Sequence, residues 1–374
     1  MSLVILHIIP TMGQGGAERL LQSLAARPAD GQRHIVLTLF DDALFRDGID
    51  LRTLGFKRRR RLTSFLRFAL AWRAIRAIIK SENVRIVHGW LYYGMLATLY
   101  ARPHVDKVVW SIHNTFMPSK GMRGALRSAE RLCGLLSRWL PDRIVYCAQS
   151  ARAAHETRGY RRDIAIVIDN GVDANRFRTL PPEEVIATRR GLGFRETDQV
   201  VGVFARFHPQ KDLPNTFAAV AECARTHSGI RLLLAGAGMS LENAELADAL
   251  ERAGVMERTV LVDMRDDIAE LLAAIDMIVS GSAYAEAMPM VVLEALFCGL
   301  PIAATDVGDI ARLDIPRSAL VPPSNHMALA RAIATGLDQG KASPIWRRAF
   351  DLTKARFSIE AYRRGHASLY EALG

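Results

Sequence analysis

Two glutamates eight positions apart, Glu286 and Glu294, are placed where side chains often meet a ligand. Glu286 follows the apolar run 277–280, which predicts a strand, so it falls in the loop at the strand's end. Glu294 falls about two turns into the helix that we expect to begin near Pro289 and to end at Gly299. Its sequence neighbours are mostly apolar, which is unusual for a solvated glutamate. Carboxylates at this spacing could accept hydrogen bonds from two groups of hydroxyls on one extended ligand.

Two cations, Arg206 and Lys211, stand five positions apart directly after the apolar run 200–205. At the end of one strand they could converge on a single diphosphate, because arginine offers a bidentate fork and lysine a point charge. The alternative is that they form ordinary surface ion pairs.

The glycine-rich stretch 10–19 follows the first apolar run and contains Gly15 and Gly16. Glycines there allow close backbone approach, and a helix beginning just after them would direct free N–H groups at an anion. The stretch is not a dinucleotide fingerprint, since Glu18 stands where the third glycine should fall, and it lacks the Gly-Lys-Ser/Thr of a P-loop. It predicts a phosphate cradle, and the alternative is a simple tight turn.

Short apolar, β-branched runs that alternate with helical patterns must position these residues. The runs are 3–9, 34–40, 85–88, 108–113, 143–147, 164–168, 200–205, 231–235, 260–262, 277–280, 302–305 and 319–321. This alternation predicts an α/β protein with two doubly wound, Rossmann-like domains facing across a cleft. We expect domains at 1–175 and 176–354, with the polar, proline-containing stretch 178–199 as the connector.

Positive charge is concentrated in the first half of the chain. The 374 residues carry 49 Lys and Arg against 39 Asp and Glu, a net charge of +10, which divides into +14 up to Val172 and −4 beyond it. From Leu51 to Ser81 there are ten basic residues, no acidic one and apolar residues at helical spacing, and the stretch from Met122 to Trp139 has a similar composition. Both stretches predict contact with an anionic membrane surface. The alternative is a pair of core-packed helices with solvated basic faces.

The four cysteines have no paired spacing, so the sequence predicts neither a zinc site nor a disulfide framework. A reducing compartment is therefore expected, and the seven-residue apolar run near the N-terminus predicts a strand rather than a signal peptide. No stretch reaches about 18 uncharged apolar residues. We expect a cytoplasmic protein, peripheral on the inner face of the cell membrane.

Taken together, these motifs resemble the family-4 retaining glycosyltransferases of the GT-B fold. The resemblance rests on Glu286-x7-Glu294, Ala205-Arg206-x4-Lys211, Gly15-Gly16-Ala17-Glu18 and the stretch 169–173; Asp306-Val307-Gly308-Asp309 resembles the branch that builds bacterial polysaccharides and lipid-linked glycans. It implies that the C-terminal domain binds a nucleotide-sugar donor, with UDP as the expected nucleotide, and that the N-terminal domain binds the acceptor. It also implies a final helix, about 355–374, that packs back on the N-terminal domain.

The resemblance also implies a role for each site residue. Glu294 would hold the donor ribose and Glu286 the transferred sugar, while Arg206 and Lys211, helped by N–H groups of Gly15 and Gly16, would neutralise the diphosphate. His113, at a predicted strand end, matches the family's active-site histidine. The remaining donor contacts would come from Met264, Arg265, Met288, Met290 and Val291.

The implied reaction is sugar transfer with retention of anomeric configuration, without a metal ion or a cofactor. A developing charge on the leaving phosphate would be stabilised electrostatically by the two cations. Ala287 and Met288 depart from the family pattern, which leaves the identity of the sugar open. The alternatives are a nucleotide-sugar epimerase of the same fold, or a basic protein without activity that binds nucleic acid or membrane. The basic segment interleaves with helical apolar residues and carries no nucleic-acid motif, so we expect no nucleic-acid partner.

Overall fold

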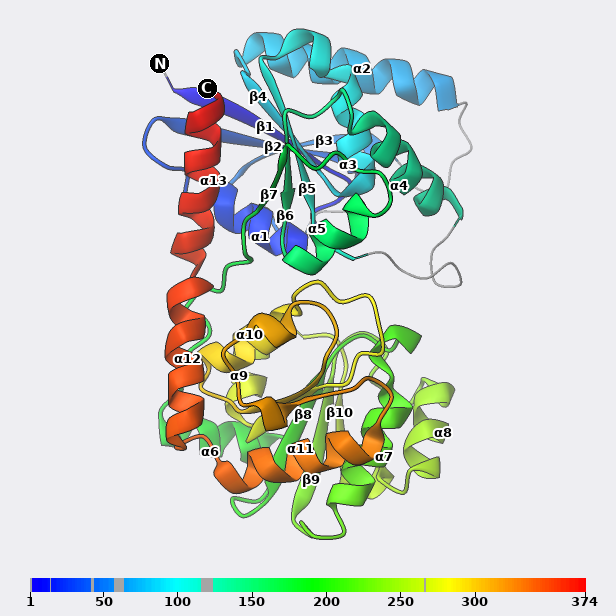
Figure 1. Ribbon diagram of the computed structural model, residues 1–374, viewed down its shortest axis with the longest axis vertical. Coiled ribbons are helices and arrows are strands. Elements are labelled where there is room, and N and C mark those ends of the chain that lie inside the picture. The colour runs from blue at the N-terminus through cyan, green and yellow to red at the C-terminus, as the bar shows by residue number, and fades with distance from the viewer. Residues whose placement is uncertain (1, 14, 42–43, 57–63, 116–123, 266) are drawn as a thin grey trace. The chain divides into compact units, whose positions relative to one another are not determined.

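The computed structural model describes residues 2–13, 15–41, 44–56, 64–115, 124–265 and 267–374, with only the backbone of residues 64–69. The chain divides into two compact units (Figure 1). Unit 1 comprises Met1–Gly171 and Ile359–Gly374, and unit 2 comprises Val172–Ser358.

Unit 1 is built on a parallel sheet with the strand order β3-β2-β1-β4-β5-β6-β7. Its central strands are almost entirely buried and rich in aliphatic residues, as expected when helices cover both faces of a parallel sheet. The strands are β1 (Leu3–Ile9), β2 (Gln32–Phe40), β3 (Asp50–Phe56), β4 (Ile86–Trp90), β5 (Lys107–Ile112), β6 (Arg143–Tyr146) and β7 (Ala165–Val167). The helices are α1 (Gly16–Ala25), α2 (Ser64–Ser81), α3 (Leu91–Ala97), α4 (Gly124–Leu136), α5 (Gln149–Glu156) and α13 (Ile359–Leu373), with short turns η1 (Thr98–Tyr100) and η2 (Arg102–His104).

Unit 2 repeats the doubly wound plan, with the strand order β10-β9-β8-β11-β12-β13. Its strands are β8 (Gln199–Phe204), β9 (Ile230–Ala235), β10 (Thr259–Val262), β11 (Met277–Ser280), β12 (Ile302–Thr305) and β13 (Leu320–Val321). Its helices are α6 (Pro182–Gly191), α7 (Leu213–Cys223), α8 (Ala244–Arg252), α9 (Ile268–Ala273), α10 (Met290–Phe297), α11 (His326–Gln339) and α12 (Pro344–Arg356). Its short turns are η3 (Pro209–Lys211), η4 (Met256–Arg258), η5 (Ile310–Arg312) and η6 (Arg317–Ala319). Helices α7 and α11 pack together over one face of the sheet, where Phe217 and Leu329 are fully buried.

The prediction of an α/β protein with two doubly wound domains is confirmed, and each predicted strand lies within two residues of an observed one. Strand β3 was not predicted. It is an edge strand with a half-exposed, partly polar pattern, so it carries little of the apolar signal that marks a buried strand. In the stretch from Leu51 to Ser81, the apolar residues at helical spacing lie on helix α2, as predicted, while the first residues of the stretch belong to β3.

The stretch 178–199 is not a connector, because it lies entirely inside unit 2 and its residues 182–191 form α6. Its Pro182 occupies the first helical position, where a missing N–H is harmless, and acidic residues follow in the first turn. Arg189 anchors the helix: it is buried, donates to the Ala274 carbonyl at 2.9 Å and pairs with Asp276 at 2.7 Å. The proline and glycine signals that suggested a linker are the start and end signals of this helix.

Helix α13 packs on the sheet of unit 1 although it lies at the far end of the chain (Figure 1). The Tyr370 hydroxyl is 2.7 Å from Nδ1 of His88, and both side chains are fully buried. Arg363 donates to the backbone carbonyl and to the hydroxyl of Ser23 on α1, each at 2.9 Å. These contacts join β4 and α1 to the last helix.

Candidate functional site

The predicted diphosphate and sugar residues meet at one edge of the unit 2 sheet. Arg206 and Lys211 follow β8, and Glu286 follows β11. These two strands are neighbours in the sheet although they are far apart in sequence, so the strand order reverses between them. Such a topological switch point, at the carboxyl ends of parallel strands, is where open α/β sheets bind ligands.

Glu286 is at the centre of the polar contacts at this edge. It is 9% exposed, and its Oε1 atom accepts from Lys211 Nζ at 2.6 Å, Ser282 Oγ at 2.7 Å and Gln210 Nε2 at 3.3 Å. The Lys211 ammonium and the Glu286 carboxylate therefore neutralise each other.

Arg206 is joined to the same cluster through Gln210. Its Nη2 donates to Gln210 Oε1 at a long 3.5 Å, and Gln210 itself is buried. His208 lies between the two cations in sequence, and its Nδ1 accepts from the Gln210 backbone N–H. Burial, followed by the charges of Arg206 and Lys211, lowers the pKa of His208, so the imidazole is neutral beside them.

Backbone geometry brings the Glu286 loop close to the next strand end. A Cβ atom on Gly308 would lie 2.4 Å from the Ala287 carbonyl oxygen and 2.6 Å from that of Glu286, so only glycine fits. Gly308 also has φ +78°, and the following Asp309 N–H donates to the Ala287 carbonyl at 2.7 Å. The Asp306–Asp309 motif thus supports the Glu286 loop from behind.

Glu294 is 6% exposed on α10, the helix that follows this loop. Together with burial, its charge raises the pKa of the Cys298 thiol to about 12, so that thiol stays protonated. Met288 is buried just before the helix, while Met290 and Val291 are partly exposed in its first turn. The two predicted carboxylates therefore belong to one loop-and-helix element, with the predicted donor contacts between them in sequence.

Met264 and Arg265 follow β10, two strands away from β8 in the sheet. Met264 is 56% exposed, which makes it available to a flat ligand surface. Arg265 forms a bidentate pair with Asp267, and that hydrogen bonding raises the pKa of the guanidinium. The structure does not bring either residue into the Glu286 cluster.

Gly15 and Gly16 belong to unit 1, at the switch point between β1 and β4. Gly16 opens α1, as predicted for a helix start. The Gly15 N–H, however, donates to the Gly13 carbonyl at 3.0 Å. A Cβ atom on Gly15 would lie 2.0 Å from a carboxylate oxygen of Glu18, so this carboxylate folds back over the loop. The Glu18 carboxylate of α1 thus lies within the predicted phosphate cradle.

His113 follows β5 and its ring stacks on Trp90, with centroids 5.1 Å apart and planes 11° from parallel. Both ring nitrogens are buried and lack a hydrogen bond of normal geometry among the described residues. Burial lowers the pKa of His113 to about 3, an effect that the nearby Asn170 side chain opposes only weakly. The imidazole is neutral and has an N–H to offer, which suits a ligand hydroxyl or phosphate oxygen.

A second group of histidines lies in the core of unit 1, against α13. His7 and His34 share a hydrogen bond at 2.9 Å, and His88 bonds Ser111 and Tyr370, each at 2.7 Å. Burial lowers the pKa of His34 and His366 to about 4, and it lowers those of His7 and His88 well below the usual value. We call His7, His34, His88 and His366 the histidine core. It has no counterpart among our sequence-based site residues.

Exposed apolar side chains gather on the helices that follow β3 in unit 1. They are Leu70 and Trp72 on α2, Tyr93 on α3, Leu99 on η1, Leu132 and Leu135 on α4, and Trp139 just after α4. Within the unit, α3 packs against α4 and η1, and η1 against α2. The neighbouring arginines are Arg73, Arg76, Arg131 and Arg138, none of which has an acidic partner among the residues that the structure describes. We call α2, α3, η1 and α4, together with Trp139 just after α4, the basic-apolar helices because they carry these apolar and basic residues.

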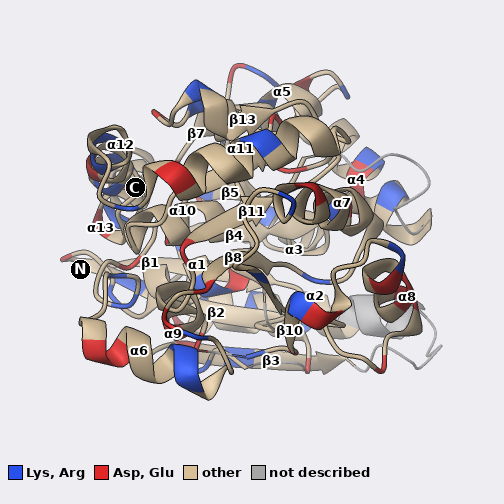
Figure 2. Cartoon of the chain, turned by 90° about the horizontal axis from the view of Figure 1, so that it is seen from below, with Lys and Arg blue, Asp and Glu red and all other residues tan. Residues whose placement is uncertain are grey.

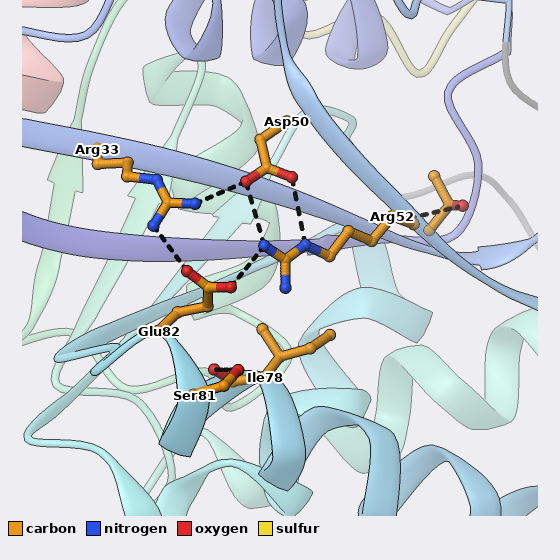
Figure 3. Close-up of polar contacts among 7 residues, drawn as sticks. Arg33, Asp50, Arg52, Ile78, Ser81 and Glu82 are labelled. Atoms are coloured by element: carbon orange, nitrogen blue, oxygen red, sulfur yellow. Dashed lines mark hydrogen bonds and ion pairs between the residues drawn. The ribbon is translucent and has the colours of Figure 1, made fainter.

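One part of the predicted membrane segments, Arg52, needs correction, and two other parts lie outside the described residues. Arg52 does not contribute a free charge, because it pairs with Asp50 at 3.2 Å and with Glu82 at 2.8 Å, and Arg33 bonds the same two carboxylates (Figure 3). The acidic partners flank the stretch from Leu51 to Ser81, so a count within that stretch missed them. The run from Lys57 to Arg61 and residues 122–123 lie outside the described residues.

In unit 2, α6 carries acidic residues in its first turn and basic residues in its last, and α8 carries three acidic residues and one arginine (Figure 2). None of the helices within the described ranges combines the length and apolar composition needed to cross a membrane.

Comparison with family models gives two matches. A model described as Glycosyltransferase Family 4 matches residues 14–176, and one described as Glycosyl transferases group 1 matches residues 198–339. A D-inositol 3-phosphate glycosyltransferase of Segniliparus rotundus is 30% identical over 239 residues, which is 62% of this chain and 52% of that protein. The lipopolysaccharide core biosynthesis mannosyltransferase LpsB of Rhizobium meliloti is 26% identical, over 55% of this chain and 60% of its own length. The chain thus matches little more than half the length of these curated relatives.

Solved structures share the fold over the whole chain. HepE from Anabaena, solved in complex with UDP and glucose, superposes with a TM-score of 0.84 and 23% identity, covering 98% of this chain and 99% of that one. WaaG, a glycosyltransferase involved in lipopolysaccharide biosynthesis, gives a TM-score of 0.74 with 17% identity, covering 98% and 99% of the two chains. At these identities the likeness concerns the fold.

Proposed function

Because the chain belongs to glycosyltransferase family 4 and has the GT-B fold, we propose that it transfers a sugar from a nucleotide-diphosphate sugar to a lipid-linked or polysaccharide acceptor. We further propose a UDP-sugar as donor, retention of anomeric configuration, and an acceptor held at the inner face of the cell membrane. The observation that carries the donor half is the cluster at the β8–β11 switch point, where Arg206, Lys211 and Glu286 converge.

The cations of this cluster suit the leaving group. When the anomeric C–O bond breaks, negative charge develops on the diphosphate, and prearranged positive groups stabilise it without reorganisation of solvent. Gln210 accepts a long hydrogen bond from Arg206, and Glu286 pairs with Lys211. In this proposal Lys211 moves from Glu286 to the diphosphate, and the freed carboxylate contacts hydroxyls of the transferred sugar.

The buried Glu294 suits the nucleoside end of the donor, where a ribose diol can donate two hydrogen bonds to one carboxylate. Exposed Met264 would lie beside the base. Retention follows if the acceptor hydroxyl enters on the face that the phosphate leaves, with a phosphate oxygen taking the proton. His113 is proposed as a neutral hydrogen-bond donor to a substrate oxygen, consistent with its low pKa and with ring nitrogens that have no hydrogen bond of normal geometry among the described residues.

Unit 1 has the character of an acceptor domain for a membrane-held substrate. It carries a net charge of +14, against −4 for unit 2. Its basic-apolar helices expose Trp139 at 68% and Leu135 at 55%, in the neighbourhood of Arg131 and Arg138. Aromatic and aliphatic side chains flanked by arginine are the composition of helices that lie in the interface of an anionic bilayer.

A panel of UDP-, GDP- and ADP-sugars tests the donor. The ligand that raises the melting temperature most identifies the nucleotide, because binding to the folded state alone stabilises it by mass action. The panel matters because HepE was solved with UDP, whereas a relative in Corynebacterium glutamicum is named as GDP-mannose-dependent. Absence of stabilisation by every member of the panel would contradict the proposal.

Vesicle co-sedimentation tests the membrane contact. Full-length protein should pellet with vesicles containing anionic lipid and not with neutral ones, and added salt should weaken the binding. The double variant Leu135→Ser and Trp139→Ser should bind several-fold more weakly, since it removes two of the exposed apolar side chains. Leu241→Ser is the matched control, because Leu241 is equally exposed (65%) but lies in unit 2. An equal loss of vesicle binding in both variants would contradict the assignment of the membrane contact to these helices.

A further inference from the structure

We propose that Ser282 and Gln210 are positioning residues that hold Glu286 in place for the donor sugar once Lys211 has turned to the diphosphate. This inference rests on the proposed function, in which Lys211 has two successive partners. Of the three donors to Glu286 Oε1, the ammonium of Lys211 is the one that a diphosphate would draw away. The Ser282 hydroxyl at 2.7 Å and the Gln210 amide at 3.3 Å then remain.

The three donors all address the same oxygen of the carboxylate. Oε1 accepts from Lys211, Ser282 and Gln210, while no bond is formed to Oε2 within the described part of the chain. A carboxylate oxygen has about two favourable lone-pair directions, so Oε1 is saturated and Oε2 is left for a substrate hydroxyl. The arrangement sets the rotation of the carboxylate as well as its position.

Ser282 is well placed to act as a fixed donor. It is only 1% exposed, and its backbone carbonyl accepts a 2.6 Å hydrogen bond from the Thr305 hydroxyl on the neighbouring strand β12. The preceding Gly281 admits no side chain, since a Cβ atom there would lie 2.2 Å from Thr216 Oγ1. A donor held on both sides in this way directs its hydrogen bond at one point in space.

Gln210 connects the sugar carboxylate to the phosphate cations. It is 4% exposed; its Nε2 donates to Glu286 and, at 3.1 Å, to the Ala285 carbonyl, while its Oε1 accepts from Arg206. Ala285 has φ +61°, a left-handed conformation that alanine adopts only when its surroundings impose it. The amide of Gln210 thus holds the strained residue next to Glu286 and bonds Arg206 at its other end.

The two residues differ in what they touch, which separates their expected effects. Among the substrate-contacting groups of the proposal, Ser282 bonds only Glu286, so its loss should affect the sugar and leave diphosphate affinity unchanged. Gln210 also bonds Arg206, so its loss should weaken binding of both the sugar and the diphosphate. A purely structural role in the fold would predict no such division.

The test compares Ser282→Ala, Gln210→Met and Ser280→Ala in the full-length protein. Ser280 is the matched control because it is buried (7% exposed) at the end of β11 without contact to Glu286. Calorimetry gives the affinity for UDP and for UDP-glucose, or for GDP and GDP-mannose if the donor panel selects guanine. Steady-state kinetics gives kcat/KM for the same donor.

We expect Ser282→Ala to bind the nucleotide normally and the nucleotide sugar about tenfold more weakly, with a similar drop in kcat/KM, as for the loss of a hydrogen bond to a charged group. Gln210→Met should weaken the binding of both the nucleotide and the nucleotide sugar, whereas Ser280→Ala should weaken the binding of neither. Ser282→Cys, with a weaker donor at the same place, should fall between the wild type and Ser282→Ala.

The outcomes distinguish this inference from the proposal beneath it. Wild-type protein that binds no nucleotide sugar contradicts the proposed function. If the wild type binds the nucleotide sugar but Ser282→Ala has the same ratio of sugar-nucleotide to nucleotide affinity as Ser280→Ala, the positioning role is overturned while the proposed function stands. A variant whose thermal unfolding shows loss of folding is replaced by Ser282→Cys, which reports on the same hydrogen bond.

Discussion

In unit 1 the buried polar side chains near α13 are neutral, whereas those at the strand edge of unit 2 carry charge. The histidine core avoids the cost of burying charge by holding its imidazoles unprotonated. The Glu286 cluster keeps its charges by pairing Lys211 with the carboxylate and adding two neutral donors. The difference shows that burial alone does not identify a binding site. The histidine core holds α13 on its sheet, whereas the Glu286 cluster contains a cation, Lys211, that can leave its carboxylate partner for an anionic ligand.

Of the substitutions that test this comparison, replacing Lys211 in the Glu286 cluster should have the largest effect. Lys211→Ala removes a charge that acts on the leaving diphosphate, and we expect transfer to fall about a thousandfold, the loss typical of one prearranged electrostatic group. The variant should still fold, since Glu286 keeps the hydrogen bonds from Ser282 and Gln210. Initial rates measured beside far-UV circular dichroism check both statements. Full activity in a folded variant would remove Lys211 from the mechanism.

Acid should break the neutrality of the histidine core. In the folded protein the pKa of His34 and of His366 is about 4, below the value of about 6.5 for an unfolded chain. The unfolded state therefore takes up protons first, so stability is complete above pH 6.5 and is lost as the pH falls toward 4. Each such histidine should lower the free energy of unfolding by roughly 3 kcal/mol over that interval. Urea unfolding at pH 7.5, 6, 5 and 4 measures the effect, and His366→Phe should make the pH dependence shallower.

A single hydrogen bond of the histidine core should have a smaller effect. Tyr370→Phe leaves Nδ1 of His88 without its 2.7 Å partner in a fully buried place, and we expect a loss of about 1–2 kcal/mol of stability. Tyr93→Phe is the control, because Tyr93 is 37% exposed and water can replace its contacts. Chemical denaturation of both variants gives the comparison. Equal losses would indicate that the Tyr370 hydroxyl contributes little to the docking of α13.

The smallest expected effect concerns the strained residue beside Glu286. Ala285→Gly should relieve the left-handed strain, while glycine loses more entropy on folding, for a net gain of about 0.5 kcal/mol. Donor affinity should fall slightly at the same time, because a more flexible Ala285 position holds Glu286 less firmly. Thermal unfolding and calorimetry with the donor measure the two effects. A large loss of stability would show that this backbone is not under strain.

Much of the site was predictable because charged residues and strand signals stand close together in sequence. Arg206, Lys211 and Glu286 each follow a recognisable buried strand, and parallel strands place such residues at one edge. Ser282 and Gln210 were not predicted as site residues. Serine and glutamine are common near loops, and their role depends on which atom their side chains bond. The signal that could have found them is their proximity in sequence to Glu286 and Lys211.

The sequence by itself determined the strand-helix alternation, the charge difference between the two halves and the order of the family motifs, because these depend on periodicity and composition along the chain. Only the tertiary structure decided the rest. It showed that Arg52 is neutralised by residues outside its own segment, that stretch 178–199 contains a helix of unit 2, and that Lys211 and Glu286 meet 75 positions apart. The physical reason is that hydrogen bonds and ion pairs form between atoms brought together by the packing of strands, and a linear pattern does not contain those distances.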